Sequence, residues 1–203
     1  MQEVTPLINI TLVVVLGLIM LYHNYRFNGL FNAIVFSIIS GGIGILVEYV
    51  GVSSGGYGYT GQNIVMVLLF TGFGWIVNSY MAMHLTKIIM QMNKRANINS
   101  PRDLVKLGVS TGLIGVMYDM FTDPVDTALK VWTWSDEGVW FGVPTGNFIG
   151  WFMILTSTII GYTLVLNYGK TKKHKVLLSV LFTIIGSLAV ILTLRVCWII
   201  GIR

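Results

Sequence analysis

Residues 118–151 hold five of the eight acidic residues and four of the six tryptophans of the chain, between two apolar runs. The stretch reads YDMFTDPVDTALKVWTWSDEGVWFGVPTGNFIGW. Carboxyl groups can donate and accept protons during a reaction, and the faces of aromatic rings attract positive charge. Acids and indoles together therefore suit acid chemistry through a carbocation, provided that the fold brings them to one place.

The composition is that of an integral membrane protein. Of the 203 residues, 55% are hydrophobic and only 10% are charged, whereas soluble domains carry roughly a quarter charged residues. The single cysteine, Cys197, excludes an internal disulfide, and the N-terminus lacks the basic start of a signal peptide. A helix of about 20 apolar residues crosses the bilayer, so we expect an all-α polytopic bundle that forms one transmembrane domain, residues 1–203. The expected spans are residues 5–22, 29–48, 63–86, 104–121, 145–168 and 176–200.

Basic residues are distributed unevenly between the two sides of this bundle. The loops after spans one, three and five hold ten of the 13 lysines and arginines, and the other side has only Lys130 and Arg203. Because cytoplasmic loops carry the excess of positive charge, we expect a multi-pass protein of the cell membrane with both termini extracytoplasmic. The basic rim is expected to contact membrane lipids and not nucleic acid, since no aromatic residues are interleaved with it.

This topology places polar side chains from five spans at one depth, just beneath the outer surface. Arg195 lies about one and a half turns from the outer end of span six, by helix rise. The other four are Glu48 at the end of span two, Asn63 at the start of span three, Asp119 at the end of span four and Asn147 at the start of span five. The sequence therefore predicts a shared polar site at this depth.

Asp119 lies on a face of span four that is otherwise made of small residues. Small residues let neighbouring helices approach, so the carboxyl group of Asp119 is expected inside the bundle. An ionisable group there is a candidate functional residue, and a structural ion pair with Arg195 is the alternative. The small residues of this face are Gly108, Thr111, Gly112 and Gly115.

The segment Asp123-Pro124-Val125-Asp126 has the pattern of a helix start. Aspartate suits the capping position, proline the first turn and an acid the third position. This pattern predicts a short interfacial helix after span four. Asp126 is then the capping partner, whereas Asp123 is interpreted equally well as a cap or as a chemical group.

Aromatic residues surround this region in both outer loops. Glu48 precedes the loop GVSSGGYGYTGQN, which does not match a phosphate-binding loop. Its glycines allow a tight turn that brings Tyr57 and Tyr59 back towards the bundle. Tryptophans commonly anchor a protein at the membrane interface, and the same rings suit a cation site. Those in the second loop and the following span are Trp132, Trp134, Trp140 and Trp151.

Two segments match the motifs of a known family. An aspartate at a helix end, then D-P-V, W-x-W and G-V-P-x-x-N-F-x-G-W, resembles the CruF-type carotenoid hydratases, a family of carotenoid biosynthesis proteins that includes the bisanhydrobacterioruberin hydratases. The second segment runs from Glu48 through Gly51 to Tyr57-Gly58-Tyr59. The first segment consists of Asp119, Asp123-Pro124-Val125, Trp132, Trp134, Gly142-Val143-Pro144, Asn147-Phe148 and Gly150-Trp151.

The resemblance implies hydration of a terminal isopropylidene double bond, with no redox cofactor and no metal. The substrate is expected to be a lipophilic polyene or polyprenyl chain that arrives from the bilayer. We hypothesise that Asp119 or Asp123 donates the proton, and that Glu48 is its partner or the base that orients water. Asn147 positions the water and Arg195 tunes the carboxyl groups. The expected substrate contacts are Tyr57, Tyr59, Trp132, Trp134, Trp140, Phe148, Trp151 and Asn63.

Three other functions stay open from the residues alone. A membrane terpene cyclase would use the same acid, but a neighbouring double bond would capture the cation. A prenyl transferase would hold magnesium through Asp119 and Asp123, although that site faces away from the cytoplasm and lacks a second aspartate motif. A small transporter or lipid-binding protein would be expected to have broken helices and a site at the bilayer midplane. The sequence leaves the substrate's length and the oligomeric state open.

Overall fold

The structure is a computed structural model that describes residues 4–59, 64–91, 100–136 and 138–202. Within these ranges it contains six long helices and one small two-stranded sheet. The helices are α1 (Val4–Asn28), α2 (Leu30–Ser53), α3 (Ile64–Ile89), α4 (Pro101–Ala128), α5 (Thr145–Tyr168) and α6 (Lys172–Ile199), and the strands are β1 (Tyr57–Tyr59) and β2 (Trp132–Trp134).

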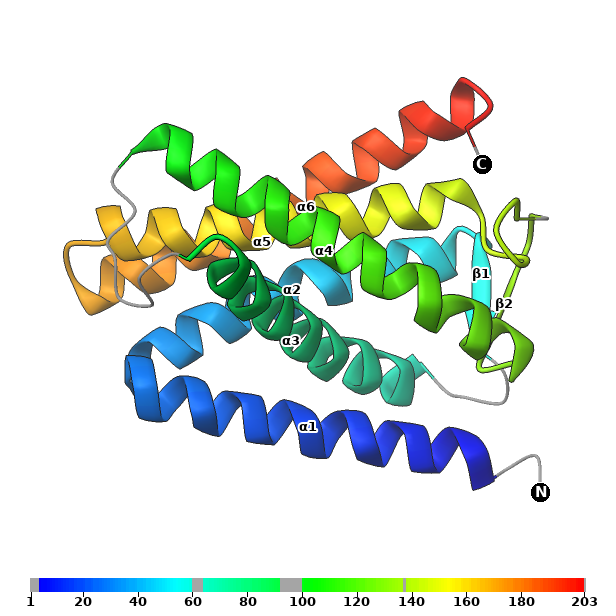
Figure 1. The fold of residues 1–203 in the computed structure, drawn as a ribbon, viewed down its shortest axis with the longest axis horizontal. Coiled ribbons are helices and arrows are strands. Elements are labelled where there is room, and N and C mark those ends of the chain that lie inside the picture. Colours follow the sequence, from blue (N-terminus) through cyan, green and yellow to red (C-terminus); the bar gives the residue numbers. More distant parts are fainter. Residues whose placement is uncertain (1–3, 60–63, 92–99, 137, 203) are drawn as a thin grey trace.

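Successive helices run in opposite directions through the bundle (Figure 1). α1 begins, and α6 ends, at the same end of the bundle that carries β1 and β2, which we call the sheet end. α2 lies in the interior of the bundle, in contact with α1, α3, α5 and α6. Its side chains Phe36, Ile39 and Ile43 are fully buried and form the middle of the apolar core. The expected all-α bundle is therefore confirmed.

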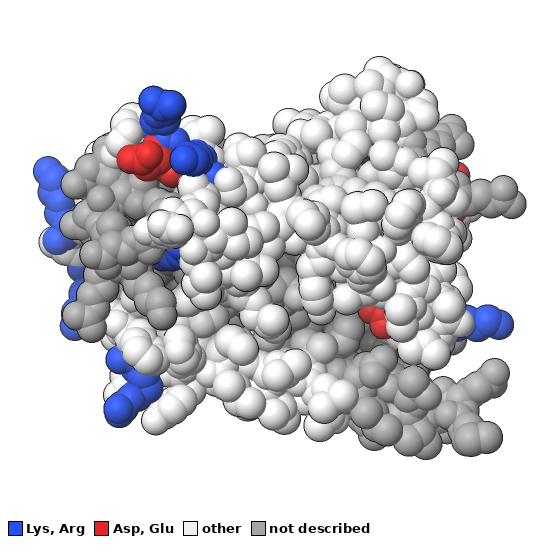
Figure 2. All heavy atoms as spheres, in the orientation of Figure 1, with Lys and Arg blue, Asp and Glu red and all other residues white. Residues whose placement is uncertain are grey.

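The helices make the chain a multi-pass membrane protein. Within the described ranges, α2 to α6 are each long and apolar enough to cross a membrane, and the remaining expected span, residues 5–22, lies within α1. Figure 2 shows lysines and arginines gathered at the end opposite the sheet end. Arg26 and Lys87 lie in the last turns of α1 and α3 there, and Arg102 lies in the first turn of α4. Lys170 lies between α5 and α6, and the first turn of α6 adds Lys172, Lys173 and Lys175.

α4 does not end where the sequence predicted a new helix to begin. It continues through Pro124 to Ala128, so the expected short interfacial helix is the last part of α4, and the interpretation of Asp123 as a helix cap was wrong. A proline inside a helix leaves the carbonyl four residues earlier without its usual donor. Here that carbonyl belongs to Met120, and it accepts a 2.8 Å hydrogen bond from the indole of Trp140. The indole therefore replaces the missing backbone donor.

The two loops at the sheet end are joined by strands that the sequence analysis did not predict. β1 pairs antiparallel with β2, with Tyr57 opposite Trp134 and Tyr59 opposite Trp132. Both the backbone nitrogen and the hydroxyl of Ser135 then donate to the carbonyl of Gly56, at 3.1 and 2.8 Å. The sheet fixes the tyrosines of one loop against the tryptophans of the other.

Small residues bring α4 and α5 together as the sequence predicted. A Cβ atom at Gly112 would lie 2.4 Å from the hydroxyl of Thr156, and one at Gly115 would lie 1.8 Å from a methyl group of Leu155. At Gly112 the neighbours include the backbone oxygen of Phe152 at 2.9 Å, so the contact requires glycine there, whereas at Gly115 the nearest atom is the end of a leucine side chain that can turn aside. Asp119 continues the same face one turn later and is buried with it. Its carboxyl group is therefore directed at the beginning of α5.

Candidate active site

Three of the predicted residues form one hydrogen-bonded cluster between α4 and α5. Asp119 and Asp123 lie one helical turn apart on α4, with 0% and 3% of their surfaces exposed. The side-chain nitrogen of Asn147, in the first turn of α5, donates to both, at 2.7 Å to Asp119 Oδ2 and 2.5 Å to Asp123 Oδ2. The two carboxyl groups are therefore joined through one amide nitrogen.

One oxygen of this cluster has no hydrogen-bond partner within the described part of the chain. Asp119 Oδ1 is buried, and neither Asn147 nor another described side chain donates to it or accepts from it. An unsatisfied buried polar atom is costly and calls for an explanation. A reactant that bonds to this oxygen, or a proton held on it, is a sufficient explanation.

Glu48 is held by a second set of donors. Tyr57 and Tyr59 both donate their hydroxyl groups to Glu48 Oε2, the latter at 3.3 Å, and Trp75 donates its indole nitrogen to Oε1 at 3.3 Å. Burial, together with the nearby charge of Glu48, raises the pKa of both tyrosines well above their usual value. The two phenols therefore remain protonated donors, and Glu48 acts as the acceptor.

On either side of Glu48, α2 has a glycine at the position that an aromatic ring approaches. A Cβ atom at Gly44 would lie 2.1 Å from the ring of Trp75, and one at Gly51 would lie 2.7 Å from the ring of Tyr57. These two glycines share one helix face with Glu48, because residues separated by three or four positions are neighbours on a helix. The sequence analysis missed Trp75. Its position inside an apolar span was a usable indication, since a buried indole nitrogen usually finds an acceptor.

Aromatic rings enclose the acids at the sheet end. Tyr57 packs on Trp134 with ring centroids 5.0 Å apart, and Tyr59 packs on Trp132 at 5.7 Å. Trp151 of α5 lies 4.6 Å from Trp75 of α3 by the same measure. Such faces can stabilise a cation held among them.

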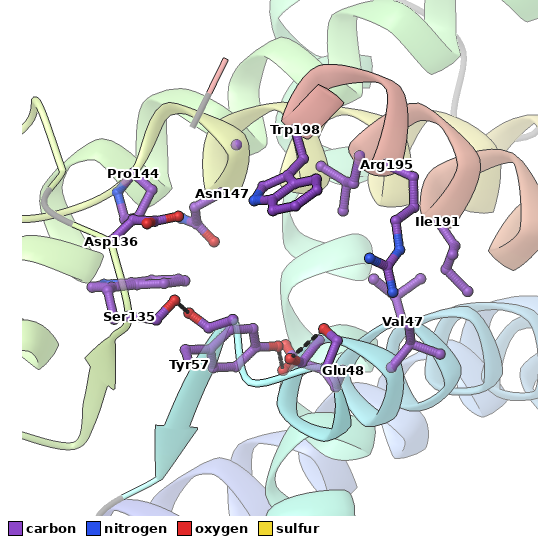
Figure 3. Close-up of a pocket in the computed structure, with 18 of the residues that line it drawn as sticks. Val47, Glu48, Tyr57, Ser135, Asp136, Pro144, Asn147, Ile191, Arg195 and Trp198 are labelled. Atoms are coloured by element: carbon purple, nitrogen blue, oxygen red, sulfur yellow. Dashed lines mark hydrogen bonds between the residues drawn. The ribbon is translucent and has the colours of Figure 1, made fainter. Parts of the chain in front are cut away.

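Two cavities adjoin these residues, with volumes of about 460 and about 420 Å³. The first, drawn in Figure 3, lies between α2, α5 and α6 and includes Arg195 in its wall, with the Arg195 side chain extending from α6 towards α2. The second lies between α1, α3 and α4 and includes Asp123. Residues common to both are Glu48, Tyr57, Trp75, Trp134, Asn147 and Trp151.

The remaining predicted site residues do not belong to the hydrogen-bonded clusters around Asp119 and Glu48. Arg195 shares a cavity with Glu48 and Asn147, and among the described residues it forms no ion pair with Asp119, whose partner is Asn147. Trp140 and Phe148 line neither of the two cavities. Asn63 lies outside the described residues. Within the described ranges, no group of three or more histidines, cysteines and acids is placed to hold a metal ion.

Fold and site together define a membrane-embedded helical bundle with a buried acid pair beside aromatic-lined cavities. The chain belongs to the carotenoid biosynthesis protein family, whose model matches residues 8–202. No protein of curated function and no solved structure shows significant similarity to the chain. The match confirms the family that the sequence motifs indicated, and it gives the chain a role in carotenoid biosynthesis.

Proposed function

We propose that the chain is a carotenoid hydratase, which adds water to a terminal isopropylidene double bond by acid catalysis and forms a tertiary alcohol. The observation that carries the proposal is the pair of buried acids, Asp119 and Asp123, joined by Asn147, with Asp119 Oδ1 left unpaired among the described residues. Burial beside a second carboxyl group favours the protonated form of an acid. A protonated carboxyl group is what protonation of an alkene requires.

The reaction balances without any further reactant. The carboxyl proton of Asp119 or Asp123 adds to the less substituted carbon of the double bond, which leaves a carboxylate and a tertiary cation. A water oxygen then bonds to the cationic carbon, and one of its protons returns to the carboxylate. The acid is restored, and neither an oxidant nor a reductant is consumed.

The neighbouring residues have roles that fit these steps. The rings of Tyr57, Tyr59, Trp132 and Trp134 line the cavity that also includes Asp123, and such rings can stabilise a cation. Asn147 reaches both acids through its amide nitrogen and lines both cavities, which supports a role for its amide oxygen in accepting a hydrogen bond from the attacking water. Glu48 is kept in place by its three donors, which fits a role as the partner of the acid or as the base that orients water.

We further propose that the sheet end faces the outside of the cell membrane. Most of the basic residues lie at the opposite end (Figure 2), and the positive-inside rule assigns that end to the cytoplasm. Lys130 follows α4 at the sheet end. In a Cys197→Ser background, Lys130→Cys should react with a membrane-impermeant maleimide on intact cells. Labelling only after lysis would reverse the orientation.

Expression in a host that makes acyclic carotenoids tests the proposed reaction. The pigments should gain the mass of one water at one end or at both ends. The Asp119→Asn variant should abolish this product, and Asp103→Asn, the same change at the other end of α4, should keep it. Pigments that change structure without changing mass would instead indicate a cyclase.

A further inference from the structure

The two cavities lie on opposite sides of one wall of side chains. This wall is formed by the residues that both cavities share, and it includes Glu48, Asn147 and the rings of Tyr57 and Trp134. Asp123 contributes only to the cavity between α1, α3 and α4, whereas Arg195 contributes only to the cavity between α2, α5 and α6. The site is therefore approached from two sides whose lining residues differ.

The cavity between α1, α3 and α4, which we call the side cavity, follows the helices away from the sheet end. Its lining reaches Asn78, about 20 Å along α3 at the helical rise of about 1.5 Å per residue. Its rim includes Leu16, Phe121 and Val125, which are 43%, 75% and 55% exposed on the sides of α1 and α4. Exposed apolar side chains on the side of a membrane bundle face lipid, so this cavity opens to hydrocarbon.

The cavity between α2, α5 and α6, which we call the end cavity, is built differently. Beside apolar helix residues, its lining includes loops and helix ends of the sheet end, among them Ser54, Gly56, Ser135 and Asp136. Ser54, Ser135 and Arg195 are all exposed. Polar side chains at the end of a membrane bundle lie at the level of the headgroups and water. This cavity therefore opens to the aqueous phase.

We propose that the two reactants reach the acids by separate routes, the hydrocarbon chain through the side cavity and water through the end cavity. The assignment of these two reactants rests on the proposed hydration, whereas the difference between the two environments does not. Asp123 faces the hydrocarbon chain of the substrate. Asn147 and Glu48, which belong to the wall, also face the water in the end cavity. The chain end is thus protonated on one side of the wall, and the cation is met by water from the other side.

Two glycines allow the environments to be probed with little disturbance. A Cβ atom at Gly146, in the lining of the end cavity, would meet no atom within 4 Å, and one at Gly74, in the side cavity, would lie 3.8 Å from Val13. Gly146→Cys and Gly74→Cys in a Cys197→Ser background therefore form a matched pair. Val13→Cys and Ser54→Cys, from the side and end cavities respectively, repeat the comparison if either glycine variant does not fold.

The pair is reconstituted in lipid nanodiscs and treated with a charged methanethiosulfonate reagent and, separately, with a lipid-soluble maleimide. The end-cavity cysteine should react with the charged reagent about tenfold faster or more, because a thiol in apolar surroundings forms little thiolate. The lipid-soluble reagent should modify the side-cavity cysteine. Equal rates with the charged reagent, or faster reaction of the side-cavity cysteine, would overturn the proposal.

The assignment of reactants is tested by filling each cavity. Gly74→Leu should raise KM or lower kcat/KM for a long polyene more than for a short isoprenoid, because only the long chain occupies the full side cavity. Gly146→Leu should lower kcat for both substrates alike, since it obstructs water. The same dependence on chain length for both variants would contradict separate routes. Absence of hydration in the unmodified protein would contradict the proposed function and leave the labelling result standing.

Discussion

Asn147 of α5 donates a 2.7 Å hydrogen bond to Asp119 of α4, a residue 28 positions earlier in the chain. The contact depends on the glycine face of α4, which lets α5 approach closely enough for a short amide side chain to reach a carboxyl group. The same nitrogen also reaches Asp123. Asn147 therefore fixes the spacing of the two acids.

Replacing Asn147 by alanine should lower turnover about 100-fold, the lower end of what a positioned proton-transfer group contributes. Without the amide, the two carboxyl groups lose their shared donor and the orientation that it imposes. Steady-state rates in detergent or nanodiscs measure the effect. Asn32→Ala, which removes a hydrogen bond to a backbone carbonyl in α1, is the control and should leave turnover unchanged. A fully active Asn147→Ala variant would remove Asn147 from the mechanism.

Gly44→Ala should destabilise the bundle by about 1–3 kcal/mol, the usual range for overpacking. The new Cβ atom would lie 2.1 Å from Trp75, so the indole must move and give up its bond to Glu48. Thermal denaturation measures the change. Gly41→Ala, in the same helix, meets its nearest atom at 3.5 Å and should not lower the melting temperature. Equal behaviour of the two variants would mean that the contact with Trp75 carries no constraint.

Tyr57 should not ionise in the pH range where ordinary tyrosines do. Burial, with Glu48 nearby, raises the pKa of Tyr57 well above its usual value, and a raised phenol pKa means that the neutral form persists to higher pH. Near-ultraviolet titration should therefore show the same tyrosinate absorbance around pH 10 in wild type and in Tyr57→Phe. Loss of one titrating group in the variant would show that Tyr57 is an ordinary exposed phenol.

Trp140→Phe should cost about 1 kcal/mol of stability through the lost bond to Met120. The physical reason is Pro124, which cannot donate to that carbonyl. In a Pro124→Ala background, the backbone nitrogen of residue 124 supplies the donor, so the same Trp140→Phe change should cost much less. Denaturation of the four proteins of this double-mutant cycle measures the coupling. Equal costs in both backgrounds would show that the indole does not substitute for the missing backbone donor.

The sequence was sufficient to predict the six helices and the inward direction of Asp119, because both follow from the pattern of apolar and small residues. The long apolar runs set the helices, and Gly112 and Gly115 mark the face on which Asp119 continues. The shared depth of Glu48, Asp119 and Asn147 could also be predicted, because it follows from the alternating direction of successive helices.

Features that depend on contacts between distant segments were not predictable in the same way. Asp123-Pro124 has the local pattern of a helix start, but a tertiary contact from Trp140 allows the helix to continue. Strands β1 and β2 are short, and their pairing arises from two loops meeting at the end of the bundle. The bond of Trp75 to Glu48 likewise joins two helices, and no local pattern reports it.

The most direct measurement is the incubation of purified protein with an acyclic carotenoid in water enriched in heavy oxygen, followed by mass analysis. The wild-type protein should form a product that contains one added water carrying the label, and Asp119→Asn, with an unchanged melting temperature, should form none. Unlabelled product, product of unchanged mass, or equal turnover by Asp119→Asn would contradict the role of the buried acid pair.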